Sequence, residues 1–172
     1  MNARRGVTLA IIGAIAVALV LAVAGGAIAG KKTVKVGAEL SGQDEVPPTG
    51  VGSGAADLKL KKKKKKVCFD ISFEGLSSDT TAAHIHKGNP GVNGPIEVGL
   101  FEGVQTSPVD GCVKAKKKLI KKIGKKPKKY YVNVHTTEHP AGEIRGQLHK
   151  GKSEGSGSNT APPPDNGGGI VY

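Results

Sequence analysis

The chain has 172 residues and is basic: 26 lysines and arginines against 14 aspartates and glutamates give a formal net charge of +12. A charge of this size suits a polyanionic partner such as a wall polymer, lipid headgroups or nucleic acid, but it also serves solubility. For an exported protein, which the N-terminus indicates, we favour solubility over nucleic-acid binding.

The first 29 residues have the form of an export signal. Basic Arg4 and Arg5 precede an uncharged apolar run from Val7 to Ala24, and Ala27-Ile28-Ala29 fits an A-x-A cleavage signal. We expect residues 1–29 to be a signal peptide, which leaves a net charge of +10 without the two arginines. The alternative is an uncleaved N-terminal anchor helix, because the apolar run approaches the roughly 18 residues that span a bilayer. In both cases we expect a secreted or extracellular protein, either free or associated with the membrane or wall.

Residues 30–150 form the expected domain, and they alternate apolar and polar residues in short runs typical of half-buried β-strands. The clearest run covers residues 67–74, where one face consists of Val67, Phe69, Ile71 and Phe73. The other expected strands cover residues 33–40, 54–60, 82–86, 95–101, 130–135 and 142–148. Turn signals separate these runs, so we expect an all-β fold, an antiparallel sandwich or barrel.

Two lysine-rich segments interrupt the strand pattern. Lys61–Lys66 is a run of six like charges, which we expect at a solvated hairpin tip, with polyanion binding as the alternative. Around residues 114–124, four apolar residues recur at helical spacing among lysines: Ala115, Leu119, Ile120 and Ile123. This spacing predicts one short helix that ends near Gly124 and Pro127. We expect it to pack on the sheet rather than lie on a membrane.

The C-terminal residues 151–172 are rich in Gly, Ser and Pro with almost no apolar content, so we expect them to be disordered. The chain has two cysteines, Cys68 and Cys112. In an oxidising compartment we expect them to form a disulfide bond, whereas two buried free thiols are the alternative.

Three histidines are candidate metal ligands. His84 and His86 occupy alternate positions of an expected strand, so their side chains share one face. His135 lies with Asn133 on the polar side of a later strand. If the two strands are neighbours, the three imidazoles converge and can hold copper, zinc or nickel. The alternative is a structural polar layer in which His84 and Asn133 hydrogen-bond neighbouring loops.

Other chemistries find less support, and we predict no catalytic residues. A nucleophilic site needs a serine or cysteine beside a histidine, and both cysteines are assigned to the disulfide. The glycine-rich loop 88–94 is not followed by a helical pattern, which argues against a phosphate loop. No pair of carboxylates stands out for acid–base catalysis.

Several segments, taken in order, resemble the CHRD (chordin-type) domain family. They are Leu40-Ser41-Gly42 with Glu45-Val46-Pro47-Pro48, Ala83-His84-Ile85-His86-Lys87-Gly88, Gly94-Pro95, Tyr131-Val132-Asn133-Val134-His135-Thr136, and Pro140 to Leu148. The resemblance covers nearly the whole expected domain. It implies an exported β-domain, since the family occurs in extracellular proteins, including bacterial secreted ones. In chordin the repeats belong to a protein that binds growth factors, so the family name implies little chemistry.

A second resemblance concerns the order His84, His86, His135 and Arg145. Copper/zinc superoxide dismutases are similar: a His-x-His strand is followed by a later metal-binding histidine and by an arginine near the copper. The resemblance implies a Greek-key barrel of the same architecture and a copper site at which Arg145 attracts an anion or, like Asn133, supports the ligands. No histidine lies between His86 and His135, so the bridging and zinc-site histidines are missing. We therefore expect the architecture without the dismutase activity.

We thus expect a non-enzymatic binding or structural module, monomeric, whose partner is an unknown protein or an anionic cell-surface polymer. We expect no nucleic-acid partner and no membrane contact apart from an uncleaved N-terminal segment. The alternative function is a copper-binding or copper-dependent redox protein that uses the three histidines, and copper is the one candidate cofactor.

Overall fold

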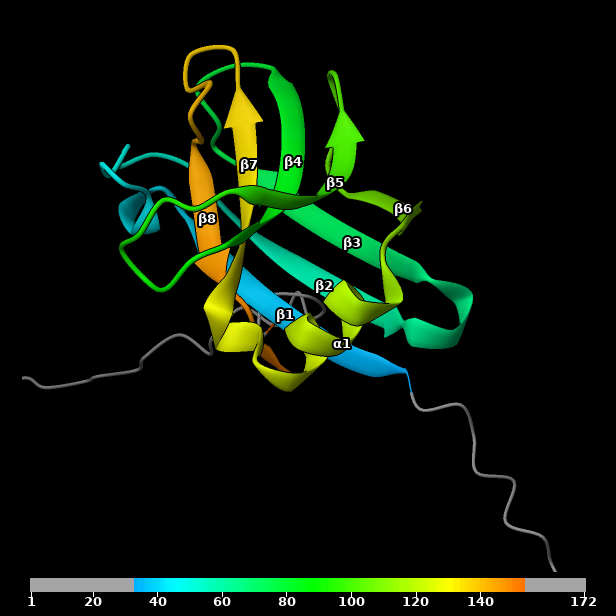
Figure 1. The fold of residues 1–172 in the computed structure, drawn as a ribbon. Coiled ribbons are helices and arrows are strands. Elements are labelled where there is room, and N and C mark those ends of the chain that lie inside the picture. The colour runs from blue at the N-terminus through cyan, green and yellow to red at the C-terminus, as the bar shows by residue number, and fades with distance from the viewer. Residues whose placement is uncertain (1–32, 154–172) are drawn as a thin grey trace, which may run out of the picture. The chain divides into compact units, whose positions relative to one another are not determined.

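The computed structural model describes residues 33–153; the expected signal peptide and the tail beyond Ser153 lie outside the described residues. Within that range the chain forms mainly β-strands: β1 (Val34–Ser41), β2 (Ser53–Lys61), β3 (Lys66–Glu74), β4 (Thr80–Lys87), β5 (Ile96–Glu102), β6 (Val109–Lys114), β7 (Tyr130–Thr136), β8 (Ile144–Gln147) and β9 (His149–Lys150). One α-helix, α1 (Lys117–Lys125), follows β6 (Figure 1). Short 3-10 turns cover Gly42–Asp44 (η1), Lys62–Lys64 (η2) and Pro127–Lys129 (η3).

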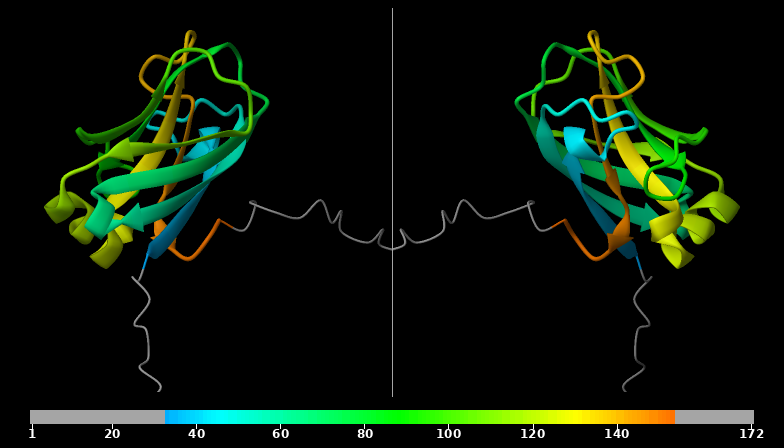
Figure 2. Two further views of the ribbon diagram at one scale, coloured as in Figure 1. Left: turned by 90° about the vertical axis from the view of Figure 1, so that its right-hand side faces the viewer. Right: turned by 90° about the vertical axis from the view of Figure 1, so that its left-hand side faces the viewer.

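The strands form one antiparallel sheet that curls into a nearly closed barrel. Hydrogen-bonded neighbours follow the order β5-β4-β7-β8-β1-β2-β3-β6, and β9 extends the pairing of β1. The end strands β5 and β6 lie side by side, which brings the sheet round on itself (Figures 1 and 2). The sequential neighbours in this order are β1-β2-β3, β4-β5 and β7-β8, while the connections from β3 to β4 and from β6 to β7 cross between distant strands. The expected all-β barrel with one helix is confirmed.

Apolar residues at alternate strand positions fill the barrel interior. In β3, Val67 and Ile71 are fully buried and Phe69 is 7% exposed, while Asp70 on the other face is exposed. Phe73, at the end of the same strand, is only partly buried against this core. Ile85, Val132 and Val134 contribute the facing residues of β4 and β7. The alternation therefore separates a dry interior from an outer face that is free to carry polar groups.

The helix begins later than the sequence pattern predicts. Residues 109–114 form strand β6, because the chain from Val109 to Lys114 pairs with β3 in continuous register, ending at Lys66 opposite Lys114. The expected helix around 114–124 is therefore found at Lys117–Lys125. Its apolar side is used as expected: Ile120 and Ile123 are buried in the core. The sequence signal of this edge strand is weak, because Gly111 lies between Val109 and Val113, which are only half-buried.

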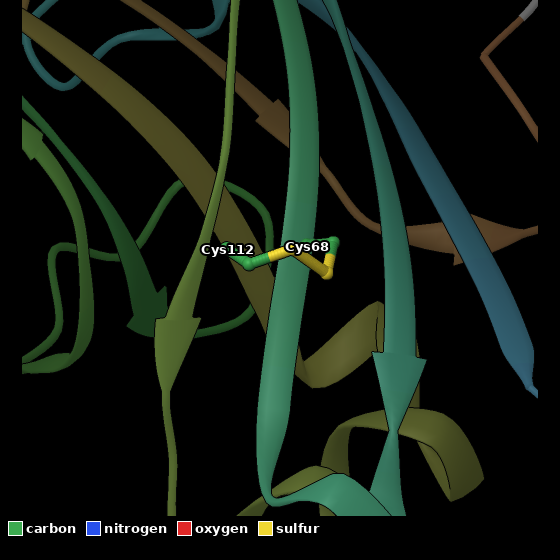
Figure 3. The surroundings of a disulfide bond; sticks show 2 residues. All are labelled: Cys68 and Cys112. Carbon is green, nitrogen blue, oxygen red and sulfur yellow. A yellow bond between two sulfur atoms is a disulfide. The ribbon is translucent and has the colours of Figure 1, made fainter.

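Cys68 and Cys112 form a disulfide bond, as expected from the sequence. The two residues face each other directly across the β3–β6 pair, with Cα atoms 3.9 Å apart (Figure 3). Free cysteines are absent from the described part of the chain. The bond joins the last strand of the sheet path to its neighbour, so it fixes the edge at which the barrel closes.

The final described residues pack onto the domain. The backbone N–H of Ser153 donates to a carboxylate oxygen of Asp57 at 2.7 Å, and Ser153 is 5% exposed. Gly37 leaves room for this segment, since a Cβ there would collide with the backbone of Ser153. Among residues 33–153, no helix has the length and apolar character needed to cross a membrane.

Candidate metal centre

The pairing of β4 with β7 brings the three histidines together. His84 lies opposite Asn133, and Ala82 lies opposite His135, although about fifty residues separate the two strands. His84, His86 and His135 all project from the outer, polar face of the sheet. The pairing of β4 with β5 shifts register between Ala83 and His84 and again between Ile85 and His86. Such bulges change the direction of side chains and are common beside functional sites.

Two backbone carbonyls orient two of the rings. His86 Nδ1 lies 2.9 Å from the carbonyl oxygen of Gly94, and His135 Nδ1 lies 3.0 Å from that of Pro140. A carbonyl oxygen only accepts hydrogen bonds, so Nδ1 of each ring carries the proton and Nε2 keeps its lone pair. Histidines that bind metals are commonly oriented in this way. Both rings are therefore set to offer Nε2 to one ligand.

The third ring faces these nitrogens. His84 Nδ1 lies 3.1 Å from His135 Nε2, and one ligand nitrogen from each of the three rings lies within 4.8 Å of the other two. Among residues 33–153, the buried Nε2 of His86 has no hydrogen-bond partner. A buried lone pair without a partner is costly, and a metal ion is one group that satisfies it. Three imidazoles fit copper, zinc or nickel.

Burial keeps the imidazoles neutral. It lowers the pKa of His135 to about 4, in spite of the hydrogen bond to Pro140, and neighbouring His84 and His86 lower it further. Burial also lowers the pKa of His84, with a smaller contribution from His86. For His86, burial lowers the pKa and the nearby Arg145 acts in the same direction. Metal coordination requires neutral imidazole, so these shifts favour a metal-ready site.

Tyr131 and Arg145 form one wall beside the histidines. The rings of His86 and Tyr131 stack with centroids 4.9 Å apart, and the Arg145 guanidinium lies 3.6 Å from the Tyr131 ring centroid. Arg145 is 2% exposed and donates to the side chain of Asn93 and the backbone oxygen of Val92. From this position its positive charge helps to lower the pKa of His86. Its hydrogen bonds join the loop after β4 to the sheet.

Gly94 links Tyr131 to His86. Its carbonyl accepts from His86, and its N–H donates to the Tyr131 hydroxyl at 3.1 Å. A Cβ at Gly94 would collide with the backbone oxygen of Lys87, so the loop can close over β4 only with glycine here.

Asn133 lies deeper in the same polar layer, beside a buried carboxylate. Asn133 is 2% exposed, and Glu45, from the loop after η1, is 5% exposed. Burial raises the pKa of Glu45 to about 7, although Arg145 and the Asn133 amide oppose the shift. Gly142, with a φ of 133°, brings its backbone so close that a Cβ would collide with the Asn133 amide.

Sequence reasoning identified the three histidines, Asn133 and Arg145, but it missed Glu45 and Glu143. Glu143 is fully buried and accepts hydrogen bonds from Ser77 and from the Thr136 hydroxyl, which fixes the turn that carries Pro140. Both residues lie in segments that resemble the family, but an acidic residue in a turn-rich segment looks solvated, so nothing in the sequence signalled the burial of Glu45. Glu143 directly precedes β8 and is two positions from Arg145, and that spacing was the available signal for its burial.

A comparison with models of protein families shows which family the chain belongs to. A model of the CHRD domain matches residues 36–148, from β1 through the end of the barrel. The chain belongs to the CHRD family. All three histidines lie within the matched segment of this CHRD domain. No curated protein and no solved structure matches the chain.

Proposed function

We propose that this CHRD-domain protein acts outside the cytoplasm as a non-enzymatic module that binds a transition-metal ion, copper in the first place. The observation that supports the proposal best is the convergence of His84, His86 and His135, with ligand nitrogens within 4.8 Å of one another. His84 would offer Nδ1 and the other two rings Nε2. Binding at His84 Nδ1 requires its proton to move to Nε2 or to leave, since that nitrogen now faces His135.

Copper bound by three imidazoles can serve as carried cargo or supply one-electron chemistry. We favour the carrier role. Arg145 is buried and already donates to Asn93 and Val92, which leaves it poorly placed to draw an anion from solvent. Both cysteines are joined in a disulfide, which removes the thiols as nucleophiles. The disulfide also supports an oxidising, extracytoplasmic location.

Calorimetric titration with Cu²⁺ and Zn²⁺ tests the proposal. We expect the wild-type protein to bind one equivalent of copper per chain. We expect His84→Ala to bind copper at least about tenfold more weakly, since even the loss of a residue that only supports a metal ligand costs about that much affinity. His149→Ala is the matched control, because it also removes one imidazole, but His149 contacts Glu39 of β1 and is not part of the three-histidine cluster. Failure of the wild-type protein to retain copper at neutral pH would remove the metal function and leave a binding module of another kind.

A further inference from the structure

Two lysine-rich segments distant in sequence form one surface, which we call the lysine face. It consists of Lys61–Lys66, around the β2–β3 turn, and of the lysines between Lys114 and Lys122. Neither segment contains an aspartate or glutamate. Figures 1 and 2 show α1 and the β2–β3 turn next to each other at the same end of the barrel.

Backbone contacts hold the two segments together. The N–H of Ala115 donates to the carbonyl of Lys65 at 2.9 Å, and Lys114 pairs with Lys66 in the β3–β6 register. An open hollow of about 690 Å³ lies between them. It is lined by Lys64–Lys66 and Lys114–Lys118, in which Ala115 is the one residue that is not a lysine. A concave surface formed by lysine side chains, whose ammonium groups lie around it, concentrates positive potential.

The lysine face is not neutralised within the described residues. The two side-chain ion pairs there, His149–Glu39 and Lys152–Asp57, include none of its lysines. One carboxylate, Glu97, lines the neighbouring hollow at its edge. The first turn of α1 has no acidic residue, so its lysines lie at the positive end of the helix dipole. This placement is unfavourable for the helix, and a bound anion would relieve it.

The residues of the lysine face favour one class of polyanion over membranes and nucleic acids. A membrane-surface helix needs an apolar side, but Ile120 and Ile123 of α1 are buried in the barrel core. Single-stranded nucleic acid is held by exposed aromatic rings, but Tyr130, which follows the second lysine segment, is 3% exposed, and Phe69 of β3 is 7% exposed. Lysines act as point charges without the planar fork of arginine, which suits anionic groups spaced along a flexible chain.

We propose that the lysine face binds a linear anionic polysaccharide, whose carboxylate or sulfate groups lie along the hollow between the β2–β3 turn and α1. This binding goes beyond the metal function and does not depend on it. Several ammonium groups are neutralised at once, so affinity falls steeply with salt.

The test measures binding of the purified protein to heparin and to alginate at about 50 mM and about 200 mM salt. The test variant is Lys64→Gln/Lys117→Gln/Lys118→Gln, at three exposed positions around the hollow. The control is Lys35→Gln/Lys59→Gln/Lys87→Gln, which removes three exposed charges elsewhere. We expect the test variant to bind at least one polysaccharide about 10- to 100-fold more weakly and the control to stay within about threefold of wild type.

Three outcomes would overturn the proposal. The first is equal loss in the test and control variants, which would indicate net charge alone. The second is wild-type protein that binds neither polysaccharide at the lower salt concentration. The third is tighter binding to phosphatidylglycerol vesicles or to polyuridylate than to both polysaccharides, which would assign the face to a membrane or to RNA. Copper titration of the test variant should match wild type, so failure here leaves the metal function untouched.

Discussion

His84 Nδ1 lies 3.1 Å from His135 Nε2, although the two residues are 51 positions apart in the chain. Two imidazole nitrogens at this distance share either one proton or one metal ion. Because the Pro140 carbonyl holds the proton of His135 on Nδ1, the nitrogen that faces His84 is a lone pair. Without metal, His84 must donate its own proton across this gap.

Metal binding should persist to a lower pH than at a site built from histidines of ordinary pKa, which lose their metal as the imidazoles become protonated. Burial lowers the pKa of all three rings, that of His135 to about 4, so each ring stays neutral to a lower pH than an ordinary histidine does. Three unshifted histidines would lose about a thousandfold in affinity between about pH 7.5 and 5.5, roughly tenfold each. We expect a smaller loss than this over that range and a further fall as the pH approaches 4, where His135 becomes protonated. Calorimetry at several pH values measures this, and a thousandfold loss by pH 5.5 would contradict it.

Glu45→Gln should stabilise the protein at high pH. The folded-state pKa of Glu45, about 7, is above its ordinary value of 4.5, so its contribution to stability is fully present below about pH 4.5 and is lost as the pH rises through 7. The variant avoids burying an ionised carboxylate and should gain about 1–2 kcal/mol at pH 8, allowing for screening by water. Urea unfolding at pH 5 and pH 8 measures the difference.

Asp44→Asn, at the exposed neighbouring carboxylate, is the control for this change. The histidines change the stability in the opposite direction over an overlapping pH range. Their pKa values are lowered in the folded state, so they reduce the stability as the pH falls from 6.5 toward 4. That contribution is common to wild type and variant and cancels in their difference. A difference that stays constant from pH 5 to pH 8 would show that Glu45 does not titrate as stated.

Glu143→Ala should destabilise the fold and weaken metal binding together. The fully buried carboxylate accepts from Ser77 and Thr136, and its loss leaves those donors without their partner. We expect a loss of about 2–4 kcal/mol in urea unfolding. The turn carrying Pro140 loses its anchor, so copper affinity should fall as well. Glu138→Ala, at an exposed position of the same turn, should change neither quantity; equal losses in both variants would argue against the anchoring role.

Removal of the disulfide should lower stability by about 4 kcal/mol. Cys68 and Cys112 are 44 positions apart, and a closed loop of that size reduces the entropy of the unfolded chain by this amount. The double variant Cys68→Ala/Cys112→Ala and the chemically reduced wild type should agree in urea unfolding. A loss below about 1 kcal/mol in both would mean that the unfolded chain is already restricted around β3 and β6.

Much of the fold was accessible from alternation along short segments. The side-chain period of a strand places Val67, Phe69 and Ile71 on one face, and these three are buried. The same period places His84 with His86, and Asn133 with His135, on polar faces. Strand β6 escaped this reasoning, because Val109 and Val113 are only half-buried and Gly111 lies between them, so the strand depends on pairing with β3 rather than on burial.

The sequence by itself determined which side chains share a face, because that depends only on the two-residue period of an extended chain. It also determined the lack of acidic residues in the two lysine segments. Only the tertiary structure decided that β4 and β7 are neighbours in the register that joins His84 to His135, that Glu45 is buried, and that Lys65 meets Ala115. These are contacts between distant segments, and strand order and register depend on the packing of the whole barrel rather than on any local run of residues.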